Sequence, residues 1–575
     1  MILSTILSEN KRRWGIAAVS ALAAGSVAPG VATAAAGFGP SVSVVVRGAG
    51  AGCATTVASD VSALGGRMTR QLNIIDGGSA LVPTSAVTQL SAAPCVAEVT
   101  PDGALKPASI GGYDPTQDAG SLFNTTKLIG AQSAWAHGVT GKGIGVAVID
   151  TGVAPVKGLN NAGQLINGAD VSFDSQNAAL TYNDEFGHGT HVAGIIAGND
   201  IYGANAQSGN SQGGAAYAGN TSQFIGVAPD AHIISVKVGD ESGVADVSQV
   251  IAALDWVDQH RNDNGLNIKV VNLSYGTTSG QAYTLDPIAF ATEVVWRDNV
   301  TVVAAAGNGG SGSHGLTDPG YDPYVIAVGA SDMQGSTVAA FSSWGDGIRN
   351  PDLVAPGTHI ESLRDPGSNI DLQYGATATV GSRFFLGSGT SQATAIVSGA
   401  VALYLSAHGC TPDQVKRALV MSATPLASQP AAAQGAGELN LVGALAINPG
   451  GGAQSFARST GTGSLEAARG GLHVVSGANG VALTGEQDIM GNAWNSAAIA
   501  HSEAGHNAWS GGTFNGAAWS GAGWSGAGWS GAGWSGAGWS GAGWSGAGWS
   551  GAGWSGAGWS GAGWSGAGWS DYSWS

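Results

Sequence analysis

The strongest constraint on the fold is a series of short, almost continuously apolar runs that alternate with amphipathic stretches. The runs read IGVAVID, AHIISVKV, KVVNLSY, TVVAAAG and VIAVGA, between residues 144 and 330. Runs of this kind are typical of parallel strands buried on both faces. DVSQVIAALDWVDQH, at 246–260, has helical spacing and begins with an Asp that can cap a helix. The pattern predicts a doubly wound α/β domain with a mostly parallel sheet over residues 109–448.

Groups that can carry out chemistry stand beside glycines in this domain. In such folds catalytic groups gather at the carboxyl ends of the strands. VAVIDTGV ends a strand at Asp150, and VVAAAGNGG ends another at Asn308. GHGTHVAG contains His188, and GTSQATA contains Ser391. A carboxylate, an imidazole and a hydroxyl are the three parts of a nucleophilic triad.

The order and residues of these motifs resemble those of the subtilisin-like serine proteases. The resemblance implies that Ser391 attacks the substrate, His188 takes its proton and Asp150 orients His188. It also implies that Asn308 donates its side-chain amide to the oxyanion, together with the backbone N–H of Ser391 at a helix start. The alternative for Asn308 is a loop-capping Asn beside glycine.

Two positions after the nucleophile depart from the family pattern. The family usually has Met and Pro where this chain has Gln392 and Ala395. Neither departure removes a reacting atom, so the effect is expected on the helix that follows. His191 lies within one helical turn of His188, but two such histidines without a third ligand are weak evidence for zinc, and the resemblance leaves His191 structural.

The resemblance also assigns residues that contact substrate. Edge segments of the domain would pair with an extended peptide through the main chain, and small residues would line an open, apolar side-chain pocket with its floor near Thr317–Asp318. The alternative is that these are ordinary strand-end and loop residues. The proposed contacts are Ser242, Gly243, Val244, Ser274, Tyr275, Gly276, Ala305, Ala306 and Gly307.

The N-terminus has the layout of a secretory signal over residues 1–36. Lys11, Arg12 and Arg13 precede an apolar run rich in small residues, and an A-x-A site follows at 32–34. The alternative, a membrane anchor, needs about 20 apolar residues, and this run is shorter. We therefore expect a secreted protein, extracellular or associated with the cell envelope, with no transmembrane span.

Residues 37–108 are expected to form a separate α+β unit of two strands, two short helices and a closing strand. The unit resembles the inhibitory propeptide of secreted subtilisin-like proteases, which implies a folding aid and intramolecular inhibitor removed by a cut in or just before residues 106–117. Cys53 and Cys95 lie in this unit and can pair in an oxidising compartment. Cys410 would then be left alone as a partly buried residue.

The C-terminal part has a different composition. Residues 449–515 are Gly-rich and are expected to form a small β appendage or a linker. In the tail, 516–575, GAAWS is followed by ten GAGWS copies at 521–570 and by DYSWS. A period of five places the tryptophans on no single face of a helix or a strand. The tail is therefore either an array of aromatic platforms for cell wall, polysaccharide or a neighbouring copy, or a low-complexity spacer.

Charge and loop composition restrict the partners and cofactors. The net charge is −17 with only 10% charged residues, which argues against a basic surface for nucleic acid. A long loop at 196–224 is rich in Gly and Asn and contains Asp200. The resemblance makes structural calcium an expectation, but no ligands are identified. Catalysis itself needs no cofactor.

Two functions follow from these observations. The first is a secreted serine endopeptidase made as a self-processing zymogen, with proteins or peptides as substrates. The alternative is an envelope or matrix binding protein, with a silent protease domain and the Trp repeat as its working part.

Overall fold

The computed structural model describes residues 41–101, 114–176, 180–202, 213–313, 315–448, 450–475, 481–510, 512–518, 568–569 and 571–574. The chain divides into two compact units, residues 1–111 and 112–575. The predicted signal segment, the expected maturation cut and most of the pentad repeat lie outside the described residues.

The first unit is a four-stranded antiparallel sheet covered by helices α1 and α2. Its sheet order is β2-β3-β1-β4, and the chain order β-α-β-β-α-β is that of a ferredoxin-like fold. A disulfide joins Cys53 to Cys95, with Cα atoms 5.4 Å apart. The prediction missed one strand, β2, because most of its side chains are exposed and it has no apolar run. The elements are β1 (Ser41–Gly48), α1 (Cys53–Ala63), β2 (Arg67–Leu72), β3 (Gly77–Pro83), α2 (Val87–Ser91) and β4 (Val96–Pro101).

The second unit is built on a seven-stranded sheet in the order β12-β11-β10-β8-β5-β7-β6. Every neighbouring pair of strands is parallel, and nearly all their side chains are buried, as the apolar runs predicted. The strands are β5 (Gly145–Asp150), β6 (Leu165–Asp170), β7 (His232–Lys237), β8 (Ile268–Leu273), β10 (Thr301–Ala305), β11 (Ile326–Ser331) and β12 (Leu353–Pro356).

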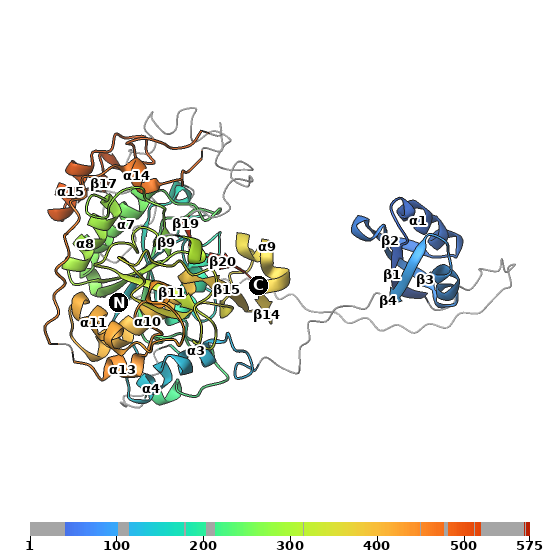
Figure 1. The fold of residues 1–575 in the computed structure, drawn as a ribbon, viewed down its shortest axis with the longest axis horizontal. Helices are drawn as coiled ribbons and strands as arrows, with labels where there is room; N and C mark the ends of the chain where they lie inside the picture. The colour runs from blue at the N-terminus through green and yellow to red at the C-terminus, as the bar shows by residue number, and fades with distance from the viewer. Residues whose placement is uncertain are drawn as a thin grey trace, which may run out of the picture. The chain divides into compact units, whose positions relative to one another are not determined.

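Helices cover both faces of this sheet, which makes the fold the predicted doubly wound α/β architecture (Figure 1). α5 (His188–Ala197) packs against α10 (Thr390–Ala407), and α7 (Val247–His260) packs against α8 (Pro287–Arg297). The N-terminal ends of α5 and α10 lie at the carboxyl edge of the sheet. The remaining helices of this part are α3 (Leu122–Leu128), α4 (Ala131–Ala136), α11 (Pro412–Ser422), α12 (Ala431–Gln434) and α13 (Leu441–Leu445).

A second, smaller sheet lies beside the start of α10. Its order is β13-β15-β14, and α9 packs on it. Two short C-terminal strands pair with strands of this unit: β19 pairs with β9, and β20 pairs with β15. The elements are β9 (Tyr275–Gly276), β13 (Ile360–Leu363), α9 (Asn369–Ala378), β14 (Thr379–Val380), β15 (Phe384–Gly389), β19 (Gly568–Trp569) and β20 (Asp571–Ser573).

The described residues between 450 and 518 pack against α7 and α8 and contribute to the main hydrophobic core. Where the sequence suggested a β appendage or a linker, the structure has two helices and a small three-stranded sheet. The indole N–H of Trp509 donates to the Ala252 carbonyl at 2.8 Å, inside α7. The elements are α14 (Leu465–Arg469), α15 (Ser496–Ala504), β16 (Trp509–Ser510), β17 (Thr513–Phe514) and β18 (Ala517–Ala518).

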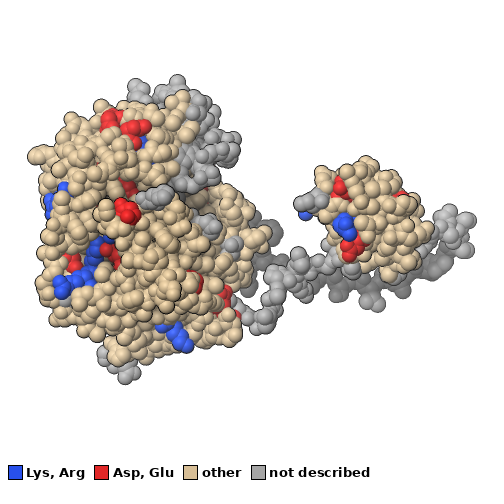
Figure 2. All heavy atoms as spheres, in the orientation of Figure 1, with Lys and Arg blue, Asp and Glu red and all other residues tan. Residues whose placement is uncertain are grey.

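Within the described ranges, no single helix has both the length and the apolar composition of a membrane span. α10 and α11 meet that test only when taken together, and the pair is bent by 113°. On the face shown in Figure 2, Lys and Arg form only small scattered groups, in keeping with the acidic net charge.

Candidate active site

Asp150 and His188 form a buried pair at the carboxyl edge of the sheet. Asp150 is the last residue of β5, and His188 is the first residue of α5. The Nδ1–H of His188 donates to Asp150 Oδ1 at 2.6 Å, and both side chains are 0% exposed. Because Nδ1 carries this proton in a neutral imidazole, Nε2 is the basic nitrogen. Burial raises the pKa of Asp150, while the imidazole and the Thr151 N–H oppose that shift.

The close approach of the two elements depends on glycine at one position. A Cβ on Gly189 would lie 2.0 Å from the carbonyl oxygen of Gly152, so no other residue fits without moving the loop. Gly187, which precedes His188, has a φ of 102° in the left-handed region that favours glycine. The glycines of the GHGTHVAG motif therefore allow α5 to begin directly against the end of β5.

A second buried carboxylate, Asp184, holds this region together. Its Oδ1 accepts from Thr151 Oγ1 at 2.6 Å and from the Gly187 N–H at 2.7 Å. Its Oδ2 accepts from both the N–H and the hydroxyl of Thr190 at 2.7 Å. Asp184 thus ties the residue after Asp150 to the first turn of the helix that carries His188. No sequence motif had pointed to Asp184.

Ser391 lies in the first turn of α10, where backbone N–H groups have no intrahelical acceptor. Its hydroxyl donates to the Ser274 carbonyl at 3.4 Å, and the Ser274 hydroxyl donates to the Ser391 carbonyl at 3.4 Å. These contacts fix the nucleophile candidate against the end of β8. α10 runs unbroken from Thr390 to Ala407, so Gln392 and Ala395 do not interrupt the helix.

Asn308 lies in the loop after β10, next to the start of α10. Its Oδ1 accepts from the N–H and the hydroxyl of Thr390, at 3.0 and 3.1 Å. Two donors on one side of the amide fix its orientation. Its Nδ2 is buried and has no hydrogen-bond partner among the described residues. Asn308 therefore braces the loop through its oxygen, and its NH₂ remains available to an oxyanion.

The residues assigned to substrate binding lie in short segments that include strand ends and a turn. Tyr275 and Gly276 form β9, while 242–244 form a turn in which Asp240 accepts from Ser242 and Val244. Ala305 and Ala306 are fully buried at the end of β10.

Thr317 lies close to two of the glycines assigned to substrate binding. A Cβ on Gly276 would lie 2.5 Å from the Thr317 side chain, and one on Gly307 would lie 2.6 Å from it. The Thr317 side chain therefore lies close to both glycines, and its place at the floor of the pocket stays a prediction.

A model of the subtilase family matches residues 141–444, which include all four proposed catalytic groups. That span is more than half of the chain. The chain belongs to the subtilase family. The match covers the seven-stranded sheet and ends before residues 450–518.

Curated relatives carry protease names. Over 298 residues the subtilase is 38% identical to serine protease AprX of Bacillus subtilis (strain 168), covering 49% of this chain and 61% of AprX. It is 33% identical to subtilisin Savinase of Lederbergia lenta over 301 residues, covering 52% of this chain and 90% of Savinase. A crystal structure of a cold-adapted subtilisin-like serine proteinase matches with 28% identity and a TM-score of 0.38, over 52% of this chain and 89% of that one.

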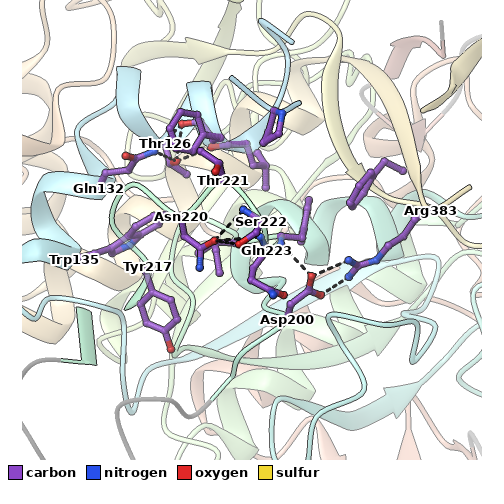
Figure 3. A pocket seen from close by; sticks show the side chains of 16 residues that line it. Thr126, Gln132, Trp135, Asp200, Tyr217, Asn220, Thr221, Ser222, Gln223 and Arg383 are labelled. Atoms are coloured by element: carbon purple, nitrogen blue, oxygen red, sulfur yellow. Dashed lines mark hydrogen bonds and ion pairs between the residues drawn. The ribbon is translucent and has the colours of Figure 1, made fainter. Parts of the chain in front are cut away.

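Asp200, in the long loop of the subtilase, is engaged by protein groups. Its carboxylate pairs with the Arg383 guanidinium, with one contact of 2.8 Å, and accepts from the Phe224 N–H at 3.0 Å (Figure 3). Burial alone would raise the pKa of Asp200, but these hydrogen bonds lower it. The pair borders a cavity of about 230 Å³ that none of the four proposed catalytic residues lines.

The described residues also contain one group with metal-like spacing, Asp258, Asp298 and His506. Arg261 pairs with Asp298 at 2.6 Å and with Asp258 at 3.0 Å, so a cation is already supplied there. His191, predicted to be structural, is buried and donates from Nε2 to the Phe385 carbonyl at 3.1 Å.

Proposed function

We propose that this subtilase is a secreted serine endopeptidase, made as a self-processing zymogen, that hydrolyses peptide bonds through an acyl-enzyme. The observation that carries the proposal is the fully buried 2.6 Å contact between His188 Nδ1 and Asp150. It leaves His188 Nε2 as the base at the sheet edge, where the first turn of α10 carries Ser391.

The reaction uses only groups of this chain and water. Ser391 Oγ attacks the substrate carbonyl as His188 Nε2 takes its proton, and Asp150 stabilises the imidazolium. The tetrahedral oxyanion accepts hydrogen bonds from Asn308 Nδ2 and from the Ser391 N–H. Collapse expels the amine, which receives the proton from His188. Water then attacks the acyl-enzyme with His188 again as base, which releases the acid and restores Ser391.

The zymogen part of the proposal is supported by the first unit. Residues 41–101 fold on their own sheet with their own small core and a disulfide. A separately folded unit before the catalytic domain is suited to removal as a whole. The disulfide favours an oxidising compartment, in agreement with the predicted signal segment. Structural calcium stays a prediction from the resemblance.

The decisive experiment compares Ser391→Ala with Ser222→Ala. Ser222 is an exposed loop residue of the same unit, so its loss controls for general effects of removing a serine hydroxyl. We expect Ser391→Ala to abolish labelling by a fluorophosphonate probe, casein cleavage and removal of residues 37 to about 110, while Ser222→Ala keeps all three.

Persistent labelling of the Ser391→Ala protein would refute Ser391 as the nucleophile. Unaided maturation of that protein would refute self-processing alone. Absence of both labelling and cleavage in the wild type, with cell-wall binding intact, would favour the binding-protein alternative.

A further inference from the structure

The last described residues of the chain lie on the edge assigned to substrate. β19 pairs antiparallel with β9, with Trp569 opposite Tyr275 and Gly568 opposite Gly276. Main-chain pairing with an exposed strand edge is a common way to bind an extended peptide. The C-terminal segment therefore occupies, through its backbone, the positions that a substrate would use.

The segment continues on the other side of the nucleophile. β20 pairs antiparallel with the end of β15, with Asp571 opposite Gly389 and Ser573 opposite Ser388. Ser391 follows Gly389 by two residues, and a single residue links β19 to β20. The chain thus runs in one direction past the nucleophile, first along β9 and then along β15, as a peptide substrate must.

Trp574 anchors this segment in an apolar pocket. Its side chain is 7% exposed and clusters with Ile370, Ala378 and Phe385, with Phe186 packed beside them. The ring centroid lies 5.6 Å from that of Phe385. The pocket is built by α9, β15 and the loop before α5, all parts of the catalytic unit.

The indole also reaches the triad. Its ring lies edge-on to His191 at 5.0 Å and to His188 at 6.3 Å between centroids. Gly387 makes room for it, because a Cβ there would lie 2.8 Å from the indole. A side chain bound here lies next to the imidazole of the base.

The sequence of the tail repeats the spacing seen in the cleft. Trp569 and Trp574 are five residues apart, in WSDYSW. Each junction between two GAGWS copies reads WSGAGW and has the same separation. Every pentad junction therefore offers a Trp at the position that the pocket accepts, next to small residues suited to main-chain pairing.

We infer that the substrate cleft of this subtilase contains a tryptophan-binding subsite on its leaving-group side, and that the chain's own Trp-Ser-containing tail is a ligand of that cleft that competes with substrate. The inference deepens the proposed function and rests on it for the meaning of the cleft. A tail segment that is hydrolysed still competes, as an alternative substrate. The tail is thus assigned a partner within the same chain.

The first experiment compares the full chain with one that ends at Ala518. Among the residues that the structure describes, the main hydrophobic core contains none beyond Ala517, so the shorter chain keeps it. We expect the apparent KM for a fluorogenic peptide to fall by roughly 10-fold on removal of the tail, with kcat nearly unchanged, because a tethered competitor acts at a high effective concentration. Equal KM values would overturn the inference.

The second experiment uses the peptide GAGWSDYSWS with the shorter chain. We expect competitive inhibition, and at least about 10-fold weaker inhibition when the Trp that corresponds to Trp574 is replaced by Ala. A scrambled peptide of the same composition is the control. Equal inhibition by all three peptides, or inhibition that is not competitive, would overturn the subsite.

Binding is also measured without activity. The shorter chain with Ser391→Ala is titrated with the dye-labelled peptide and with its Trp-to-Ala version. Trp-dependent binding to a protein whose wild type hydrolyses nothing would refute the proposed function and keep the inference. Hydrolysis by the wild type, with no Trp-dependent binding, would keep the proposed function and refute the inference.

Discussion

Asp184→Asn tests whether a carboxylate outside the triad positions the catalytic histidine. Asp184 is 2% exposed and accepts four hydrogen bonds, two on each oxygen. An asparagine has one acceptor oxygen, so one of the two backbone N–H donors, on Gly187 or Thr190, must face an NH₂ group. The two threonine hydroxyls can rotate to accept from that NH₂, but a backbone N–H cannot.

The cost follows from these contacts. The variant loses one buried hydrogen bond to a charged group, and its amide oxygen is a weaker acceptor for the remaining donors. Together these changes should lower the free energy of unfolding by about 2–4 kcal/mol. We expect Tm to fall by about 2–8 °C in a unit of this size. Since the first turn of α5 carries His188, small displacements there should lower kcat by about 10- to 100-fold with little change in KM.

Thermal unfolding is measured beside kcat and KM with a fluorogenic peptide, well below the lower Tm. The matched control is Asp346→Asn. Asp346 is exposed and also accepts two backbone N–H groups, from Ile348 and Arg349 at 2.8 Å, away from the site. For Asp346→Asn we expect only small changes in Tm and in the kinetic constants. Asp184→Asn with a lowered Tm and an unchanged kcat would refute the positioning role.

Four further changes have defined outcomes. Asn308→Ala should lower kcat about 100- to 1000-fold with KM nearly constant, as for an oxyanion donor, and a smaller loss would leave only its bracing contact with the loop. Thr317→Gly is tested with two peptides that differ only in the residue before the scissile bond, which is large in one and alanine in the other. We expect the ratio of their kcat/KM values to shift toward the large residue by about 10-fold or more, and an unchanged ratio would exclude Thr317 from the pocket. Burial raises the pKa of Glu438 to about 8. The contribution of this carboxyl group to the free energy of unfolding is therefore fully present below about pH 4.5, and it is lost as pH rises toward 8. Glu438→Gln should therefore raise Tm more at pH 9 than at pH 5, and equal shifts would contradict this. Arg469→Met should lower the free energy of unfolding by about 3–5 kcal/mol in chemical denaturation, because it leaves Asp246 buried without its 2.6 Å partner, and a loss below 1 kcal/mol would refute the pairing.

The parts of the fold that could be predicted are those with a local signature. The apolar runs of β5, β8 and β10 predict buried parallel strands, and the glycine-flanked motifs predict where Asp150, His188 and Ser391 lie. β2 was missed because it lies at a sheet edge with mostly exposed side chains. Strands of that kind have no hydrophobic pattern to detect.

The parts of the site that could not be predicted depend on contacts between distant segments. Asp184 lies in a polar loop, and its donors come from the end of β5 and from α5. An Asp three residues before the glycine that precedes a helix is a weak capping signal, and nothing local identifies its second partner. The tail is similar: its five-residue period favours no regular element, whereas its pairing with β9 uses backbone groups that any sequence possesses.

Contacts between distant segments also join the described residues of 450–518 to the seven-stranded unit. The buried Arg469 guanidinium joins α14 to Asp246, which also caps the start of α7. One residue earlier, the carbonyl of Ala468 accepts from Thr277 Oγ1 at 2.6 Å, directly after β9. The added segment therefore braces both a core helix and the strand edge on which the tail lies. Because β9 is only two residues long, its position depends on such neighbours. A substitution that loosens α14 should thus raise KM as well as lower stability, although none of its residues lies beside the triad.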